Sequence, residues 1–228
     1  MSVPNMEALP MELEADKKIS NYSTFGKIIK RAVDICGAFC GIIILFPITI
    51  MIKIVNLIKG NKESIFFSQD RIGKDGKVFK LYKFQTMVPN ADEYLKKYLE
   101  ENEDARNEYT KYKKLKEDPR VTDIGKVLRR TSLDEFPQFI NVLKGEMSLV
   151  GPRPYLPREK DDMAGYYDYI VKCQPGITGP WQVSGRNEVD FESRLKVDYE
   201  YYQNRSLSSD TSILFKTVNI VTNKRGAL

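Results

Sequence analysis

Two adjacent carboxylates, Asp134 and Glu135, follow an arginine pair and precede a Gly-Pro-Arg-Pro turn. Two such acids can hold Mg²⁺, because this cation prefers oxygen ligands and is usually bound by one or two carboxylates together with substrate phosphates. Arginine guanidiniums bind phosphate oxygens in pairs. The sequence therefore indicates metal-assisted phosphate chemistry, and the arginines nearest to the acids are Arg129, Arg130 and Arg153.

The same acids also have a structural interpretation, because Ser132 and Glu135 match the capping box S-x-x-E. Pro137 favours Asp134 as the N-cap instead, since the proline then falls in the first turn of a helix over 136–144, where no backbone hydrogen bond is due. Both acids would then stand at a helix N-terminus, where backbone N–H groups also favour a phosphate.

Composition excludes several kinds of catalysis. The chain has 228 residues and no histidine, which rules out Ser-His and Cys-His nucleophile systems and zinc sites with histidine ligands. Its three cysteines show no CxxC spacing, which is typical of a reducing compartment. The net charge of +5 comes from lysines spread among acids, so we expect anionic lipid or a small anionic substrate as partner, and no nucleic acid.

An uncharged apolar run of 18 residues covers 35–52. As a straight helix it would measure about 27 Å, barely enough for a hydrocarbon core of ~30 Å. Pro47 removes a helical hydrogen bond, so we expect a break there. Cations on both flanks favour a re-entrant helix that enters and leaves on one face. A kinked span and the buried helix of a soluble protein are the alternatives.

Within this run, Gly37 and Gly41 form a G-x-x-x-G pattern. Small residues at this spacing allow a second helix to approach closely, so a homodimer is a further expectation.

The remaining segments predict a mixed fold. Two aromatic and β-branched runs, 65–73 and 77–87, are joined through an Asp-Gly step and predict a hairpin. Good helix formers over 91–117 predict a long polar helix or a helical pair. Further helices are expected over 160–173 and 189–206, and the last apolar stretch, 213–221, should pack on the core or the membrane surface.

A loop rich in glycine and proline, 175–187, surrounds the single tryptophan, Trp181. Such a loop could offer amide donors to phosphate and a flat ring to a base or sugar. It contains no Walker-type motif, and no GxGxxG follows a strand, so kinase and Rossmann interpretations fail.

These elements place the chain in the α+β class. We expect a mostly helical membrane-associated domain with a small β-hairpin or sheet and an N-terminal re-entrant membrane helix broken at Pro47. The predicted organisation is a flexible arm over 1–26, the re-entrant helix over 27–59, and a cytosolic catalytic domain with interfacial helices over 60–228.

Five segments, in order, resemble the monotopic phosphoglycosyl transferases, a family of bacterial sugar transferases. They are KRAVDICG, FSQDRIG, YKFQTM, DPRVTDIGKVLRRTSLDEFPQFINVLKGEMSLVGPRP and PGITGPWQVSGRN, and they cover about residues 27–205. The resemblance implies a re-entrant helix, an acid dyad that requires Mg²⁺, and a role at the start of capsule, exopolysaccharide or O-antigen repeat units.

The resemblance also assigns roles to residues. Asp134 would attack the sugar-bearing phosphate of a UDP-sugar, release UMP and pass the phosphosugar to undecaprenyl phosphate, at the cytoplasmic face of the bacterial cell membrane. Glu135 would position the metal or the incoming phosphate, and both acids would hold Mg²⁺. Substrate phosphate or nucleotide would be bound by Arg71, Lys83, Arg129, Arg130, Arg153 and Arg186.

Resemblance to exopolysaccharide enzymes favours glucose- or galactose-1-phosphate as the transferred group. One departure is Gln85, which stands where the family usually has arginine. It is the feature that favours the alternative, a membrane-bound module that binds nucleotide-sugars or acts as a scaffold without turnover. A metal-dependent phosphatase, which would transfer to water, is a third hypothesis.

Overall fold

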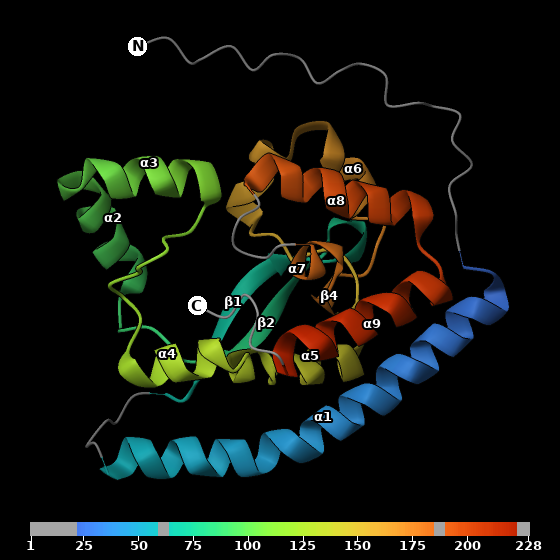
Figure 1. Ribbon diagram of the computed structural model, residues 1–228, viewed down its shortest axis with the longest axis horizontal. Helices are drawn as coiled ribbons and strands as arrows, with labels where there is room; N and C mark the ends of the chain where they lie inside the picture. The colour runs from blue at the N-terminus through green and yellow to red at the C-terminus, as the bar shows by residue number, and fades with distance from the viewer. Residues whose placement is uncertain (1–21, 59–63, 185–189, 223–228) are drawn as a thin grey trace.

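The apolar segment and its flanks form one helix, α1 (Thr24–Ile58), which runs along one side of the remaining chain in the computed structural model (Figure 1). The structure describes residues 22–58, 64–184 and 190–222, so the predicted arm lies outside the described residues up to residue 21. Among the described helices, α1 alone is long and apolar enough to cross a membrane. The predicted apolar helix is therefore confirmed.

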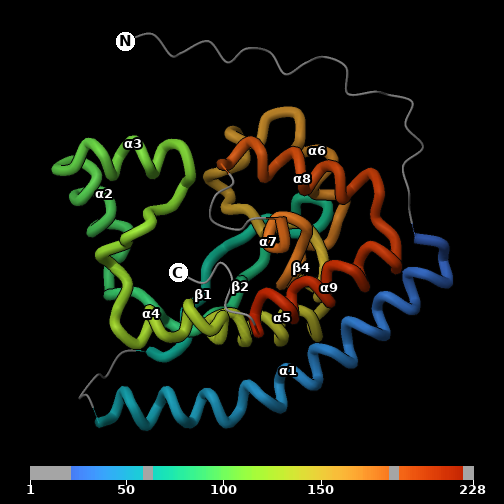
Figure 2. Tube along the Cα trace, in the orientation of Figure 1, coloured from blue at the N-terminus to red at the C-terminus, as the bar shows by residue number. Residues whose placement is uncertain are grey.

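The predicted break at Pro47 is wrong, because α1 is uninterrupted from Thr24 to Ile58. The helix continues through Pro47, and Figures 1 and 2 show its curved course. Proline removes only the bond to the carbonyl four residues earlier, so the helical turns on either side persist. Nearby, the hydroxyl of Thr49 donates to the Leu45 carbonyl at 2.9 Å, an interaction that often accompanies bending.

One face of α1 packs on the domain along nearly the whole helix. Its buried residues are Gly26, Asp34, Ala38, Gly41, Leu45, Ile52 and Asn56. The other face exposes large apolar side chains such as Phe39, Ile43 and Phe46, which a soluble core helix would bury. A helix crossing the bilayer end to end would carry the attached polar domain into hydrocarbon, where unsatisfied polar groups are costly. The packing is therefore consistent with a helix that stays on one face of the membrane.

Polar contacts fix the first half of α1 to the domain. Lys30 forms an ion pair with Asp210 at 2.6 Å. Arg31 donates to the carbonyls of Val142 and Leu143 at 2.7 and 2.9 Å, near the end of α5 (Gln138–Lys144). Cations stabilise the carbonyl end of a helix, so Arg31 acts as a cap for α5.

Asp34 also faces the domain. Its Oδ1 accepts from the Ser148 hydroxyl at 3.0 Å and from the Leu149 amide at 2.9 Å. The donors to Asp34 therefore come from the segment 148–150 of the domain.

The two glycines of the G-x-x-x-G pattern contact this chain itself. A Cβ at Gly37 would lie 2.6 Å from a methyl of Leu149, and a Cβ at Gly41 would collide with the ring of Phe139. The small residues let the domain approach α1, so they give no support to the predicted homodimer.

The predicted hairpin is confirmed, with β1 (Phe66–Ile72) antiparallel to β2 (Val78–Phe84). At the turn between them, Asp75 and Gly76 have φ of 55° and 75°. The register opposes Phe67 to Lys83 and Arg71 to Phe79. Directly opposed residues share a face, so the hairpin presents both cations on one side.

A second, parallel pair joins β3 (Ser148–Val150) to β4 (Gly176–Thr178). The other helices surround the hairpin in Figure 1. They are α2 (Ala91–Glu101), α3 (Glu103–Tyr112), α4 (Asp123–Arg130), α6 (Tyr167–Ile170), α7 (Pro180–Val183), α8 (Phe191–Asn204) and α9 (Leu207–Thr222).

These helices confirm most of the sequence expectations. The predicted polar segment over 91–117 is a helical pair. The single helix predicted over 160–173 is wrong. Ala164, with φ of 45°, interrupts the 3₁₀ segment Asp161–Tyr166, and only α6 follows as α-helix.

The contact between Gly41 and Phe139 generates a prediction about stability. Gly41→Ala should destabilise the protein by up to about 2 kcal/mol, since overpacking costs about 1–3 kcal/mol and the helix preference of alanine returns about 1 kcal/mol. Thermal unfolding in detergent micelles should show a melting temperature lower by several degrees. The matched control is Gly165→Ala, because a Cβ there meets no atom within 4 Å. Equal melting temperatures for the two variants would contradict this packing.

Candidate active site

The two acids lie in a 3₁₀ turn, Leu133–Glu135, immediately before α5. The expectation that Asp134 caps this helix is wrong: α5 begins at Gln138 and Pro137 occupies the cap position, without a side-chain cap bond. Ser132, at φ of 56°, makes no capping bond either. The carboxylates are therefore not used to satisfy the start of α5.

Lys83 holds the acid pair to the hairpin. Its Nζ lies 2.8 Å from Oε1 of Glu135 and 4.0 Å from Oδ2 of Asp134. Asp134 is buried, with 8% of its surface exposed, whereas Glu135 is partly open. Lys83 thus faces two carboxylates in a partly water-excluded place, and the charge of Arg129 also acts on Asp134.

That environment changes the acidity of Asp134. Burial, together with the charge of Glu135, raises the pKa of this carboxyl to about 6. Lys83 and Arg129 act in the opposite direction but do not cancel the rise. Near neutral pH, Asp134 is consequently an ionised but poorly solvated carboxylate. Such a group gains from a bound cation or from bonding to an electrophile.

The two adjacent arginines at the end of α4 have different surroundings. Arg129 is largely buried, donates from Nε to the Thr86 hydroxyl at 3.1 Å and lies within electrostatic reach of Asp134. Arg130 is exposed at the end of α4. Gly125 makes this arrangement feasible, since any Cβ there would collide with the Thr86 carbonyl. Sequence reasoning treated the two arginines alike, and the structure brings only Arg129 to the acids.

Arg71 lies between the acid pair and a second basic region. Its guanidinium donates to the Pro154 carbonyl at 2.9 Å and to Gln69 Oε1 at 2.8 Å. Burial, together with the charge of Arg153, lowers the pKa of Arg71 to about 9. Glu159 and Glu135 act in the opposite direction. The pKa of Arg71 therefore depends on the charges of both Glu135 and Arg153.

Trp181 has a different role from the one predicted. Instead of an open face for a base, its ring has two guanidiniums beside it, Arg153 at 5.6 Å and Arg194 at 4.8 Å from the ring centroid. Cation–π contacts of this kind orient arginines. Arg186, also predicted to bind substrate, lies outside the described residues.

Sequence reasoning missed Arg194 and Lys114. In α8, Arg194 and Asp198 lie on the buried side with Phe191 and Leu195. Charged residues at the core-facing positions of an amphipathic helix are a readable signal, because burying a charge is costly without a purpose. Lys114 follows α3 and carries no comparable signal.

The neutral side chain of Gln85 is bound to the main chain. Its side-chain amide donates to the Met87 carbonyl at 2.8 Å. The departure from the usual arginine therefore leaves the positive charge next to the acids to Lys83 and Arg129.

The acid pair suits a cation that is completed by a substrate. Among the described residues, no three acidic or cysteine side chains gather as a metal cage. Two adjacent carboxylates, with the pKa of Asp134 raised, nevertheless form the small oxygen donor set that Mg²⁺ uses when phosphates supply further ligands.

Comparisons with known proteins agree with this architecture. A family model described as "Bacterial sugar transferase" matches residues 25–224, nearly all of the described chain. The "UDP-galactose-lipid carrier transferase" of Erwinia amylovora is 42% identical over 217 residues, which cover 95% of this chain and 45% of that protein.

Two further relatives differ in length. The "Undecaprenyl-phosphate galactose phosphotransferase" of Salmonella typhimurium is 43% identical over 201 residues, 88% of this chain and 42% of that protein. The "Exopolysaccharide production protein ExoY" of Sinorhizobium fredii is 41% identical over 203 residues, 89% of each protein. The chain thus spans less than half of the first two relatives and most of the third. With a family match over this length, the chain belongs to the bacterial sugar transferase family.

Proposed function

We propose that this protein transfers a sugar-1-phosphate, glucose- or galactose-1-phosphate, from a UDP-sugar to undecaprenyl phosphate and releases UMP. The observation that carries the proposal is the buried Asp134 beside Glu135 and Lys83, in a domain packed along an apolar helix. The printed names of the Salmonella and Erwinia relatives support the lipid carrier and the galactose donor. The name "Exopolysaccharide production protein ExoY" supports a place in exopolysaccharide synthesis, and the proposal puts the reaction at the cytoplasmic face of the membrane.

The reaction proceeds in two displacements at one phosphorus atom. An Oδ of Asp134 attacks the sugar-bearing phosphorus, the bond to the bridging oxygen breaks, and UMP leaves with that electron pair. A phosphate oxygen of undecaprenyl phosphate then attacks the same phosphorus, and the Asp134 carboxylate departs. Covalent catalysis of this kind divides one difficult exchange into two easier steps.

Several residues support these displacements. Lys83 and Arg129 offset the negative charge that gathers when a phosphate approaches two carboxylates. No general base is required, since a phosphate monoester with a second pKa near ~6 is largely dianionic at neutral pH. This accounts for chemistry without histidine.

The proposal includes Mg²⁺ as the cofactor, held by Asp134 and Glu135. When bound, the ion supplies charge stabilisation to the transferring phosphoryl group. Glu135 is the more open of the two acids, so it can hold the ion while Asp134 reacts.

Replacement of the nucleophile gives the first functional prediction. Asp134→Asn should reduce UMP release from UDP-galactose or UDP-glucose, with undecaprenyl phosphate and Mg²⁺ present, by at least about 10³-fold, a typical loss for a covalent residue. The control is Asp70→Asn, which makes the same chemical change in an exposed ion pair with Lys80 and should keep activity. Undiminished UMP release by Asp134→Asn would refute the mechanism, and no release by the wild-type protein would favour a binding module.

The same substitution should stabilise the protein. The pKa of Asp134 rises from 3.8 to about 6 on folding, so the folded state binds this proton more tightly and stability falls as pH rises between about 4 and 6. At about 1.4 kcal/mol per pKa unit, ionised Asp134 costs about 2–3 kcal/mol at neutral pH. In EDTA, Asp134→Asn should therefore unfold at a higher temperature than the wild type at pH 7.5, with a smaller difference at pH 4. An equal difference at both pH values would exclude this cause.

The metal proposal predicts dependence on both the ion and Glu135. EDTA should abolish UMP release and added Mg²⁺ should restore it. Glu135→Gln should raise the Mg²⁺ concentration that gives half-maximal activity by at least about tenfold, because a charged ligand is lost. Full activity in EDTA, or an unchanged Mg²⁺ requirement in Glu135→Gln, would count against these ligands.

A further inference from the structure

Arg153 lies within electrostatic reach of three other cations, Arg71, Lys114 and Arg194, and Arg153 and Arg194 both lie beside the ring of Trp181. Arg153 lowers the pKa of Arg71, of Lys114 and of Arg194, and Arg194 also acts on Lys114. In each case burial is the larger cause, so the cations are gathered in a partly water-excluded region. We call these four residues the basic cluster.

Carboxylates also lie within electrostatic reach of the basic cluster. Glu135 and Glu159 act on Arg71, Glu108 acts on Lys114, and Asp198 acts on Arg194. Glu159 is buried and accepts from the Leu156 amide at 2.7 Å. Asp198 is fully buried, and its Oδ2 accepts from the Tyr155 hydroxyl at 2.8 Å and from the Arg153 amide at 3.1 Å. Burial raises the pKa of Asp198 to about 7, so its counter-charge is incomplete at neutral pH.

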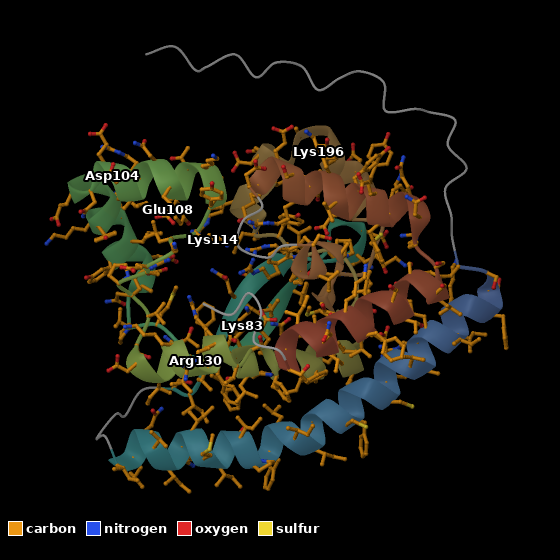
Figure 3. All side chains as sticks on the ribbon, in the orientation of Figure 1. Lys83, Asp104, Glu108, Lys114, Arg130 and Lys196 are labelled. Atoms are coloured by element: carbon orange, nitrogen blue, oxygen red, sulfur yellow. The ribbon has the colours of Figure 1, made fainter. Side chains whose placement is uncertain are left out.

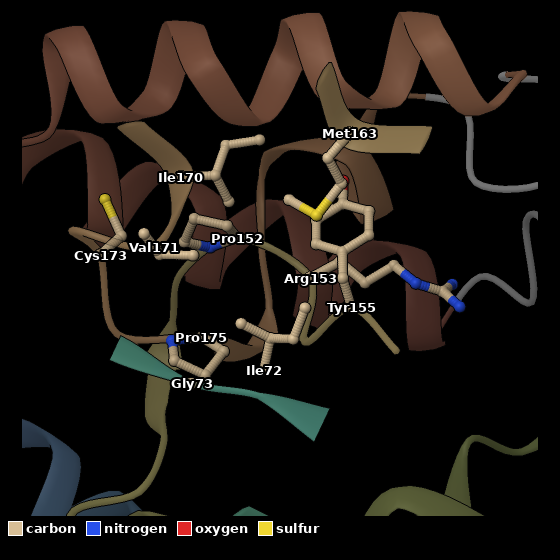
Figure 4. A pocket seen from close by; sticks show the side chains of 10 residues that line it. All are labelled: Ile72, Gly73, Pro152, Arg153, Tyr155, Met163, Ile170, Val171, Cys173 and Pro175. Carbon is tan, nitrogen blue, oxygen red and sulfur yellow. The ribbon is translucent and has the colours of Figure 1, made fainter. Parts of the chain in front are cut away.

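The backbone at Arg153 is fixed while its guanidinium is directed away from the core. Asp198 holds the main chain, and neighbouring side chains line a small apolar cavity with Ile72 and Met163. Figure 4 shows the Arg153 side chain extending out of these apolar surroundings. Its buried Nε, like Nε of Arg71, has no hydrogen-bond partner among the described residues. Buried donors without partners are rare in folded proteins, and an anion would satisfy them.

We propose that Arg71, Lys114, Arg153 and Arg194 bind the phosphate of the departing nucleotide. This inference rests on the proposed transfer from a UDP-sugar and adds Lys114 and Arg194, which none of the recognised motifs contains. In the view of Figure 3, Lys114 lies beside the α2–α3 pair and Lys83 lies on the hairpin.

Arg71 lies within electrostatic reach of both the acid pair and the basic cluster, so in the proposal it is near both phosphates of the donor. Arg71 interacts electrostatically with Glu135 on one side and with Arg153 on the other. In a nucleoside diphosphate sugar, the two phosphorus atoms share one bridging oxygen. When Asp134 attacks one of them, the bridging oxygen leaves with the other and gains negative charge. A fixed group of cations at that place stabilises this charge as it forms.

Direct binding of UMP tests the proposal without turnover. Isothermal titration of UMP and of uridine, with undecaprenyl phosphate omitted, should show tighter binding of UMP to the wild-type protein. Lys114→Met should weaken UMP binding by at least about tenfold and leave uridine binding unchanged, because only the phosphate contact is lost. Lys114→Arg keeps the charge and should retain most of the affinity. Lys116→Met removes a charge from an exposed lysine of the same linker and should have no effect.

Lys114 is partly exposed, so its replacement should leave folding intact, and thermal unfolding checks this. Arg153→Met provides a second measurement and should show the same selective loss of UMP. The proposal is overturned if both variants bind UMP like the wild type, or if Lys114→Met weakens UMP and uridine equally.

The test separates this inference from the proposed function. If Lys114→Met releases UMP normally and binds UMP with unchanged affinity, the role of the basic cluster is refuted and the proposed transferase activity stands. If the wild-type protein never releases UMP from a UDP-sugar but Lys114→Met selectively loses UMP affinity, the basic cluster stands as an anion site and the proposed transferase activity is refuted.

Discussion

The packing of α1 against α5 determines where the acid pair lies, because the turn that carries Asp134 leads directly into α5. The ring of Phe139 fills the space that Gly41 leaves open, and Arg31 closes the other end of α5. A shared apolar cluster extends this contact through Leu45 to the turn itself. The proposed reaction between a water-soluble donor and a lipid-bound acceptor requires a nucleophile near the membrane surface, and this contact fixes the proposed nucleophile, Asp134, beside the apolar helix.

Charge is distributed in two unlike groups joined by the hairpin. The first contains Asp134 and Glu135 with Lys83, and the second is the basic cluster. Each group is unfavourable alone, since burial raises the pKa of Asp134 and lowers that of Arg71. The antiparallel register puts Arg71 and Lys83 on one face, so the hairpin holds the groups side by side. A metal–diphosphate complex would complement both groups, which explains why stability is given up at this site.

Residue types and spacings within a short segment predicted the elements that depend only on that segment. The Asp-Gly turn, the polar helical pair and the apolar helix all follow from residue type and spacing, and the motifs identified the acid pair. Errors arose where tertiary geometry or backbone strain decides, as with Pro137 at the helix cap and Ala164 at positive φ. Lys114 was missed because its proposed role depends on residues distant in sequence, whereas the core-facing position of Arg194 in α8 was a readable signal. The pairing of Lys83 with Glu135 likewise needed the register of the hairpin.

The central claim is that Asp134 carries the phosphosugar between the two substrates. Intact-protein mass spectrometry after incubation with the UDP-sugar donor and Mg²⁺, without undecaprenyl phosphate, tests it most directly. The account predicts an added mass of one sugar phosphate that maps to Asp134, one UMP released per adduct, and loss of the adduct when undecaprenyl phosphate is added. An active protein that forms no adduct, and releases UMP only when the lipid is present, would contradict it.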